Sequence, residues 1–284
     1  MVQHTTGTCL GTRGIQLYTQ RWIPDNARGV LLIVHGVGDH SARYTQITQT
    51  LPEYGFVVAS YDQRGHGRSA GIRGHVTRWQ DYCHDLQRIV QSIGRDHFPL
   101  PLFLLGHSMG SLVVLRYLLS RPGDVRGAII SAPPMKAQGV AKPGLILLAR
   151  ILSCVCPRWR LTLSIQADAL SRDAGMIDAY RTDPLVHRQV TVRWGTEALA
   201  ARATIHQRAA EIRVPLLLVH GEADNIAAVR GSVELFERVG SHDKQLLTYP
   251  AALHELHNDT NREQVIEDYR LWLQRQCLAC SNRT

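Results

Sequence analysis

Ser108 is the residue whose surroundings most clearly indicate chemistry. It is the central residue of Gly-His-Ser-Met-Gly (residues 106–110), after an apolar run over residues 101–105 that is typical of a buried parallel strand. The residues after it keep leucines near helical spacing, so the order is strand, Gly-x-Ser-x-Gly, helix. This order predicts a nucleophile elbow, a tight turn that exposes the serine hydroxyl at a helix N-terminus. Glycine is expected at both ends of this motif, because a Cβ at Gly106 or Gly110 would strike the neighbouring strand or helix.

A serine hydroxyl needs a base to take its proton and a third group to orient that base. An apolar run over residues 214–220 predicts a strand, and Asp224 follows its end. A further strand is expected over residues 244–249, and His254 lies in the loop after it. The order Ser, Asp, His is the one expected in this type of sheet. Taken singly, Asp224 could cap a helix and His254 could lie on the surface, but their joint occurrence at strand ends favours a triad.

Two backbone N–H groups are candidates for binding the oxyanion of an acyl-transfer reaction. Met109 follows the candidate nucleophile, and Val37 lies between two glycines after an apolar strand over residues 30–35. Phosphate binding by this glycine-rich turn is disfavoured, because no third glycine or ribose-binding acid follows at the required distance.

Several motifs in collinear order resemble one family. They are residues 35–44 (His-Gly-Val-Gly-Asp-His-Ser-Ala-Arg-Tyr), 61–69 (Tyr-Asp-Gln-Arg-Gly-His-Gly-Arg-Ser), 106–110, 131–133, 170–173, 183–185 and 254–257. The chain resembles the monoacylglycerol lipase and lysophospholipase branch of the serine α/β-hydrolases from about residue 29 to its end. The resemblance implies Ser108, Asp224 and His254 as the triad and Val37 and Met109 as the oxyanion donors, which are the residues already selected.

The resemblance also implies residues for a polar head-group pocket. Arg43, Tyr180 and His257 match the family at positions that line this pocket, whereas Met176 stands where the animal lipase has a glutamate. A thioether is only a weak hydrogen-bond acceptor, so this departure weakens the inference to a glycerol head group without affecting the hydrolase chemistry.

Composition limits the partners that we expect. The formal net charge is +8, but the basic residues are scattered and no nucleic-acid motif occurs, so an anionic lipid surface is a better candidate partner than nucleic acid. No signal peptide and no run of transmembrane length is evident, which predicts a cytoplasmic protein with optional peripheral membrane contact. The sequence leaves the oligomeric state open.

No metal or organic cofactor is expected. The six cysteines are too dispersed for a disulfide framework, and Cys277-x-x-Cys280 has no second half-site for zinc. Residues 254–257 (His-Glu-Leu-His) place only two residues between the histidines, which is not the zincin spacing.

Strands are expected at about residues 5–12, 15–22, 30–35, 56–61, 101–106, 127–131, 214–220 and 244–249. Helical patterns separate most of them, which predicts an α/β fold, namely an α/β-hydrolase fold with a mostly parallel sheet covered by helices on both faces. Thr77 with Gln80, and Thr260 with Glu263, predict capping boxes at the starts of two of the helices.

The alternation of strand and helix stops over residues 134–213, where helical patterns run without a clear strand. We therefore expect a core formed by residues 1–133 and 214–284 and an inserted helical cap formed by residues 134–213. Residues 143–157 are apolar on nearly every side apart from Arg150, which suits either a buried core helix or a lipid-facing helix.

Together these features predict a serine hydrolase that cleaves a carboxylic ester of a lipid-like substrate, with monoacylglycerol favoured. A lysophospholipase, a general carboxylesterase, an acyltransferase and a peptidase are the alternative enzymes. A non-catalytic binding protein is disfavoured, because both Ser108 and His254 are present.

Overall fold

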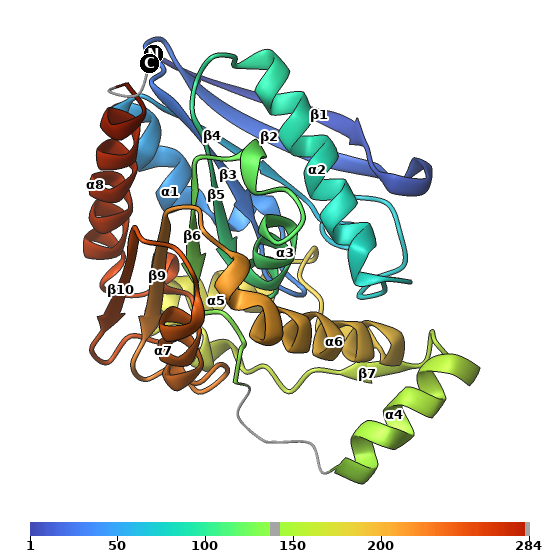
Figure 1. The fold of residues 1–284 in the computed structure, drawn as a ribbon. Coiled ribbons are helices and arrows are strands. Elements are labelled where there is room, and N and C mark those ends of the chain that lie inside the picture. Colours follow the sequence, from blue (N-terminus) through green and yellow to red (C-terminus); the bar gives the residue numbers. More distant parts are fainter. Residues whose placement is uncertain (137–142, 282–284) are drawn as a thin grey trace.

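The computed structural model describes residues 1–136 and 143–281 and contains an eight-stranded sheet (Figure 1). The strand order is β1-β2-β4-β3-β5-β6-β9-β10, antiparallel where β2 pairs with β1 and β4 and parallel elsewhere. The mostly parallel sheet predicted from the sequence is therefore confirmed. Its strands are β1 (Val2–Leu10), β2 (Gln16–Pro24), β3 (Gly29–Val34), β4 (Phe56–Tyr61), β5 (Leu102–His107), β6 (Gly127–Ser131), β9 (Leu216–Gly221) and β10 (Lys244–Tyr249).

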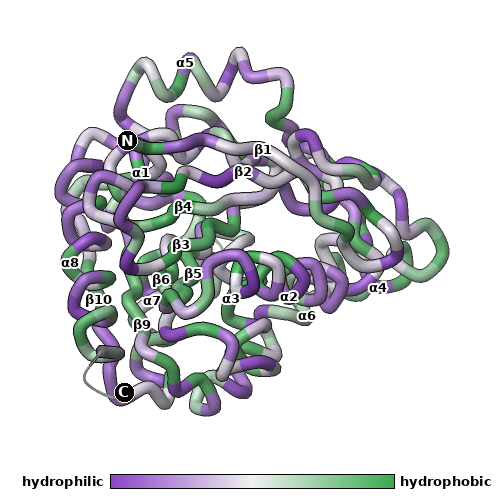
Figure 2. Tube along the Cα trace, turned by 90° about the horizontal axis from the view of Figure 1, so that it is seen from above, coloured by the Kyte–Doolittle hydropathy of each residue, from purple (hydrophilic) through white to green (hydrophobic). Residues whose placement is uncertain are grey.

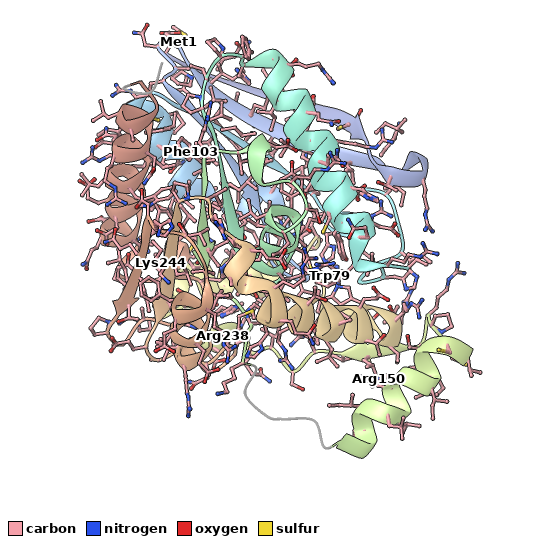
Figure 3. All side chains as sticks on the ribbon, viewed as in Figure 1. Met1, Trp79, Phe103, Arg150, Arg238 and Lys244 are labelled. Carbon is pink, nitrogen blue, oxygen red and sulfur yellow. The ribbon has the colours of Figure 1, made fainter. Side chains whose placement is uncertain are left out.

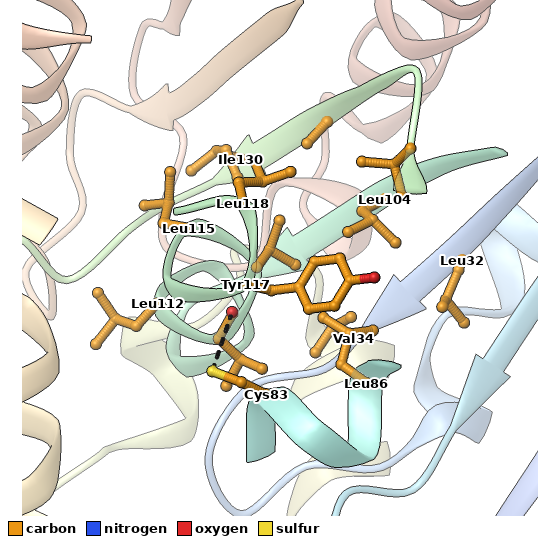
Figure 4. Close-up of a cluster of buried hydrophobic side chains, with 14 of the residues drawn as sticks. Leu32, Val34, Cys83, Leu86, Leu104, Leu112, Leu115, Tyr117, Leu118 and Ile130 are labelled. Carbon is orange, nitrogen blue, oxygen red and sulfur yellow. Dashed lines mark hydrogen bonds between the residues drawn. The ribbon is translucent and has the colours of Figure 1, made fainter. Parts of the chain in front are cut away.

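Helices cover both faces of the sheet, because alternate residues of the central strands point to opposite sides. Leu32 and Val34 of β3 belong to the core beneath α2 and α3, whereas Leu31 and Ile33 belong to the core beneath α1 and α8. Figure 4 shows the first of these cores, and the central strands are green, that is apolar, in Figure 2. The helices of the two layers are α1 (Thr45–Thr50), α2 (Trp79–Asp96), α3 (Met109–Leu118), α7 (Val229–Arg238) and α8 (Arg262–Ser281).

Residues 134–213, here called the 134–213 segment, add no strand to the large sheet in their described part. Against expectation, they include a small two-stranded antiparallel sheet of β7 and β8. Each strand has three residues, too few to show an alternating pattern in the sequence. The segment comprises α4 (Pro143–Val155), β7 (Arg160–Thr162), α5 (Ala174–Thr182), β8 (Gln189–Thr191) and α6 (Val192–Arg208).

Main-chain hydrogen bonds fasten the 134–213 segment to loops of the rest of the molecule. The His187 N–H donates to the Gly38 carbonyl (3.0 Å), and the Thr191 N–H donates to the Gly74 carbonyl (2.9 Å). In the opposite direction, the Glu255 N–H of the core donates to the Leu170 carbonyl of the segment (2.8 Å). Its division from the core as a separate cap domain is our proposal.

Both expected capping boxes are wrong. Helix α2 begins at Trp79 after Arg78, and the Trp79 N–H donates instead to the Glu197 carboxylate of α6 (2.7 Å). Figure 3 shows Trp79 beside α6. Helix α8 begins at Arg262, so Thr260 lies one residue too early to be its N-cap.

Helix α4 exposes its apolar side chains. The exposed fractions are 57% for Leu145, 60% for Leu147, 49% for Leu148 and 54% for Ile151. The helix lies at the edge of the molecule, where Arg150 is labelled in Figure 3. Its interpretation as a buried core helix is therefore wrong. No helix in the described part of the chain is long and apolar enough to cross a membrane.

Candidate active site

Ser108 lies at a sharp turn between β5 and α3. Its backbone has φ 51° and ψ −119°, in the left-handed half of the Ramachandran plot, where a residue with a side chain is strained. The strand before it and the helix after it fix this conformation, and the buried Ser111 hydroxyl donates to the Ser108 carbonyl (2.5 Å). The Ser108 side chain is thereby held at the carboxyl edge of the sheet.

The expected steric reason for the glycines of this turn is confirmed. A Cβ at Gly106 would lie 2.8 Å from the Gly110 carbonyl oxygen, and a Cβ at Gly110 would lie 1.9 Å from the Val34 carbonyl oxygen. Both distances are shorter than van der Waals contact, so a side chain at either position would force the strand and the helix apart.

His254 connects Ser108 to Asp224. Its Nδ1 lies 2.6 Å from Asp224 Oδ2, and its Nε2 lies 2.9 Å from Ser108 Oγ. Because an ionised carboxylate can only accept hydrogen bonds, Nδ1 carries the proton, and Nε2 of the neutral ring accepts the bond from the Ser108 hydroxyl. This arrangement can transfer the serine proton to the imidazole as the serine oxygen attacks an electrophile.

The surroundings of Asp224 keep it ionised. Burial alone would raise its pKa, but the attraction of His254 and hydrogen bonds from His220, His254 and the Ala227 N–H outweigh burial and lower the pKa well below its ordinary value. His220 is fully buried, and its Nε2 lies 3.1 Å from Asp224 Oδ2. The sequence analysis missed His220, although its position one turn before Asp224 was visible.

The loop that carries His254 is held on both sides of this residue. The Leu253 N–H donates to the Asp259 carboxylate (2.8 Å), and the Glu255 N–H donates to the Leu170 carbonyl (2.8 Å). The Glu255 carboxylate in turn accepts bonds from Arg43 Nη2 (2.6 and 2.9 Å). These contacts fasten the loop on both sides of His254 and so support the position of its imidazole beside Ser108.

The two proposed oxyanion donors adjoin Ser108. Met109 is the first residue of α3, so its N–H is among those at the helix N-terminus that lack an intrahelical acceptor. A Cβ at Gly36 would lie 3.4 Å from the Ser108 Cβ, which places the turn that contains Val37 directly against the serine. Val37 and Met109 also line the same cavity as Ser108.

Residues 25–261 match the family described as serine aminopeptidase, S33. The chain belongs to this family. Monoacylglycerol lipase of Mycolicibacterium smegmatis is 35% identical to it, over 93% of this chain and 94% of the relative. Monoglyceride lipase of Homo sapiens is 32% identical, over 92% of this chain and 87% of the relative. These similarities place the protein in the monoacylglycerol lipase branch of the serine hydrolases.

A solved structure supports the same family. The crystal structure of Paleococcus ferrophilus monoacylglycerol lipase superimposes with a TM-score of 0.84 at 31% sequence identity, covering 92% of this chain and 99% of that chain. The protein is thus a serine carboxylic ester hydrolase with an α/β-hydrolase fold.

The Ser108 hydroxyl of this serine hydrolase opens on a cavity of about 520 Å³. Helix α6 supplies much of its wall, and other parts of the 134–213 segment add Pro134, Ala149, Leu161, Leu163 and Ile165. Sequence analysis missed this wall, because its residues come from separate segments that only folding brings together. The described lining comprises Val37, Ser108, Met109, Leu112, Pro134, Ala149, Leu161, Leu163, Ser164, Ile165, Val192, Trp194, Gly195, Thr196, Ala198, Leu199, Arg202, Asn225 and Ile226.

The four residues predicted for a head-group pocket lie apart from this described lining. Arg43 is buried between the carboxylates of Asp39 (2.8 Å) and Glu255 (2.6 Å), with its guanidinium 4.8 Å from the centre of the Tyr180 ring.

His257 is buried and stacks on Tyr44 with ring centres 4.4 Å apart, and burial lowers the pKa of His257 to about 4. Met176 is half-buried on α5. The role of Arg43, Met176, Tyr180 and His257 in head-group binding stays a prediction.

Proposed function

We propose that this serine hydrolase cleaves monoacylglycerols to a fatty acid and glycerol through an acyl-enzyme. The observation that carries the proposal is the hydrogen-bonded series Ser108–His254–Asp224, with its serine at the wall of an apolar cavity of about 520 Å³. A cavity of this size and polarity suits an acyl chain better than a peptide.

In the proposed reaction, Ser108 Oγ attacks the ester carbonyl while His254 Nε2 takes its proton. Asp224 holds the tautomer of His254 and stabilises the imidazolium that forms. The N–H groups of Val37 and Met109 bind the oxyanion of the tetrahedral intermediate. His254 then protonates the leaving glycerol oxygen, and water hydrolyses the acyl-enzyme by the same route.

The names of the relatives support a monoacylglycerol substrate, and the apolar cavity supports a lipid-like acyl group. Lysophospholipids and simple carboxylic esters share the same scissile bond, so lysophospholipase or general carboxylesterase activity is the alternative. Turnover of matched monoacylglycerols, lysophospholipids and methyl esters distinguishes these substrates.

We also propose that α4 docks on the lipid surface that supplies the substrate. Its exposed leucines and isoleucine form an apolar surface, and Arg150 lies within the same helix. A helix of this kind gains free energy by burying apolar side chains among lipid tails and by attracting anionic head groups. Trp159 (59% exposed) and Leu161 (46% exposed), which follow α4 in the chain, are further exposed apolar side chains of the segment.

Substitution of the proposed nucleophile tests the reaction. A fluorophosphonate probe should label the wild-type protein once, at Ser108, and Ser108→Ala should lose both labelling and ester hydrolysis. The loss of the covalent route should lower kcat on the order of 10⁴-fold. An unchanged circular dichroism spectrum controls for folding. Wild-type activity in the alanine variant would exclude the mechanism.

A further inference from the structure

Arg202 is the cationic side chain in the described lining of the Ser108 cavity. It lies on α6 with Gly195, Ala198 and Leu199, at the helical spacing that places all four residues on one face. The same four residues line the cavity, so the half-buried Arg202 shares the space into which Ser108 opens.

The other arginines of α6 have partners, whereas Arg202 has none among residues 1–136 and 143–281. Arg193 donates to the Thr77 carbonyl (3.0 Å) and lies 3.7 Å from the Glu197 carboxylate. Arg208 forms a bidentate salt bridge with the Glu211 carboxylate (2.6 and 2.8 Å). Within the described part of the chain, Arg202 thus presents an unpaired charge to a cavity whose other lining residues are mainly apolar.

We propose that Arg202 is a specificity-determining residue that binds an anionic group of the ester substrate. A guanidinium binds phosphate or carboxylate through two parallel hydrogen bonds, and nearby apolar walls strengthen the attraction by excluding water. Asn225, which also lines the cavity, supplies further amide donors. The inference rests on the proposed function, because it concerns the substrate of the same serine.

The anionic group can lie on either side of the scissile ester. On the alcohol side it is the phosphate of an acylglycerol phosphate. On the acyl side it is a carboxylate at the far end of a dicarboxylic acyl chain. Both groups have the charge and the acceptor oxygens that a guanidinium binds.

The experiment compares three soluble esters below their critical micelle concentrations. These are monooctanoylglycerol, its glycerol phosphate analogue, and the glycerol monoester of the dicarboxylic acid of equal chain length. The measurement is the ratio of kcat/KM for each anionic ester to kcat/KM for the neutral ester. The fraction of folded enzyme cancels in this ratio, so partial misfolding of a variant does not affect it.

Wild type should prefer at least one anionic ester, and Arg202→Gln should lower that preference on the order of tenfold or more. Arg202→Lys should retain part of it, and added salt should weaken it. Arg208→Gln is the matched control, because it removes the same charge from the same helix outside the cavity, and it should leave the preference unchanged.

A wild type that hydrolyses the neutral ester without an Arg202-dependent preference would overturn this inference and leave the proposed function intact. An equal loss of preference in Arg208→Gln would also overturn it. Hydrolysis of the anionic esters alone, dependent on Arg202, would support the inference and exclude monoacylglycerol as the substrate. Failure to hydrolyse any of the three esters would overturn both.

Discussion

The two oxygens of the Asp224 carboxylate make separate contacts. Oδ1 accepts the N–H groups of Ile226 (2.7 Å) and Ala227 (2.9 Å), whereas Oδ2 faces His254 Nδ1 (2.6 Å). The backbone bonds to Oδ1 orient the carboxylate, so Oδ2, which also lies 3.1 Å from His220 Nε2, points at the imidazole of His254. The loop after Asp224 thus fixes the orientation of the carboxylate, and the carboxylate in turn fixes the tautomer of His254, the proposed base.

Asp224→Asn should lower kcat by up to about 10⁴-fold. If the amide oxygen keeps the two backbone bonds, its NH₂ group faces His254 Nδ1, which favours the tautomer that cannot accept the serine proton. The measurement is kcat on a soluble ester, with thermal unfolding to verify the fold.

Asp183→Asn is the matched control for a carboxylate near the same edge of the sheet. Asp183 accepts a bond from the Leu185 N–H (2.8 Å) and lies 2.8 Å from His40 Nε2, so it joins the 134–213 segment to the rest of the molecule. Its substitution should cost about 1 kcal/mol of stability with a much smaller effect on kcat. The opposite pattern would show that the acid has been misassigned.

At the scale of single elements, the first N–H group of α2 is capped by a residue of another helix, Glu197 of α6. Glu197→Ala should lower the free energy of unfolding by about 1 kcal/mol, because the Trp79 N–H loses its acceptor. Thr77→Ala should stay within about 0.5 kcal/mol of wild type, because the helix does not use the Thr77 hydroxyl as its cap. The free energies of unfolding of both variants and of wild type are measured by urea denaturation.

Glu197→Gln separates the cap from the Glu197–Arg193 ion pair, because it keeps an acceptor oxygen but removes the charge. It should be less destabilising than Glu197→Ala. A larger effect of Thr77→Ala than of Glu197→Ala would restore the capping box that the sequence predicts.

Helix α4 provides the element-scale test of lipid docking. Leu147→Asp with Leu148→Asp should reduce co-sedimentation with anionic liposomes, because both exposed leucines would otherwise enter the lipid. Binding by the wild type should weaken with salt, and the double variant should keep its activity on a soluble ester.

Leu271→Asp with Leu278→Asp on α8 is the control pair, because it adds equal charge at leucines that are 50% and 69% exposed. This pair should sediment like wild type. If the α4 variant also sediments like wild type, α4 is not the docking element.

Across the whole molecule, buried histidines predict a loss of stability in mild acid. Burial lowers the pKa of His35, His66, His107 and His257 below 6.5, and that of His257 to about 4. Below about pH 6.5 the unfolded chain binds protons at these sites before the folded chain does. The free energy of unfolding therefore falls with falling pH, by at most about 1.4 kcal/mol per pH unit for each histidine.

The midpoint of urea unfolding should consequently be lower at about pH 5 than at about pH 7. Carboxylates with a lowered pKa, such as Asp224, lose their contribution to the free energy of unfolding only as the pH falls below about 3.8, the ordinary pKa of aspartate. This pH lies below the two pH values of the comparison. An equal or higher midpoint at the lower pH would contradict the prediction.

The sequence was sufficient for features that local patterns encode. The apolar strands, the turn at Ser108 and the strand ends before Asp224 and His254 follow from hydropathy and spacing, and the chain folds as these patterns predict. Features that depend on distant partners could not be predicted. Glu197 replaces the expected cap of α2, and a carboxylate more than two hundred residues away, Glu255, binds Arg43.

The cavity beside Ser108 could not be predicted from the sequence for the same reason. Its lining joins short stretches from both halves of the chain, and no stretch alone has a distinctive pattern. A sequence pattern can reveal that α6 has small and apolar residues at helical spacing, but not that this face lies across from Ser108.

The main-chain attachment of the 134–213 segment has a consequence for how such an enzyme can diversify. Its bonds at His187 and Thr191 use backbone atoms on both sides, so these two attachments do not depend on which side chains the segment carries there. The partner loops, by contrast, require glycine at two positions. A Cβ at Gly38 or Gly74 would lie 2.0 Å or less from a backbone oxygen of the segment. The walls of the cavity beside Ser108 can thus change over a fixed mount, and under the proposed function the range of substrates can change while Ser108, His254 and Asp224 keep their positions.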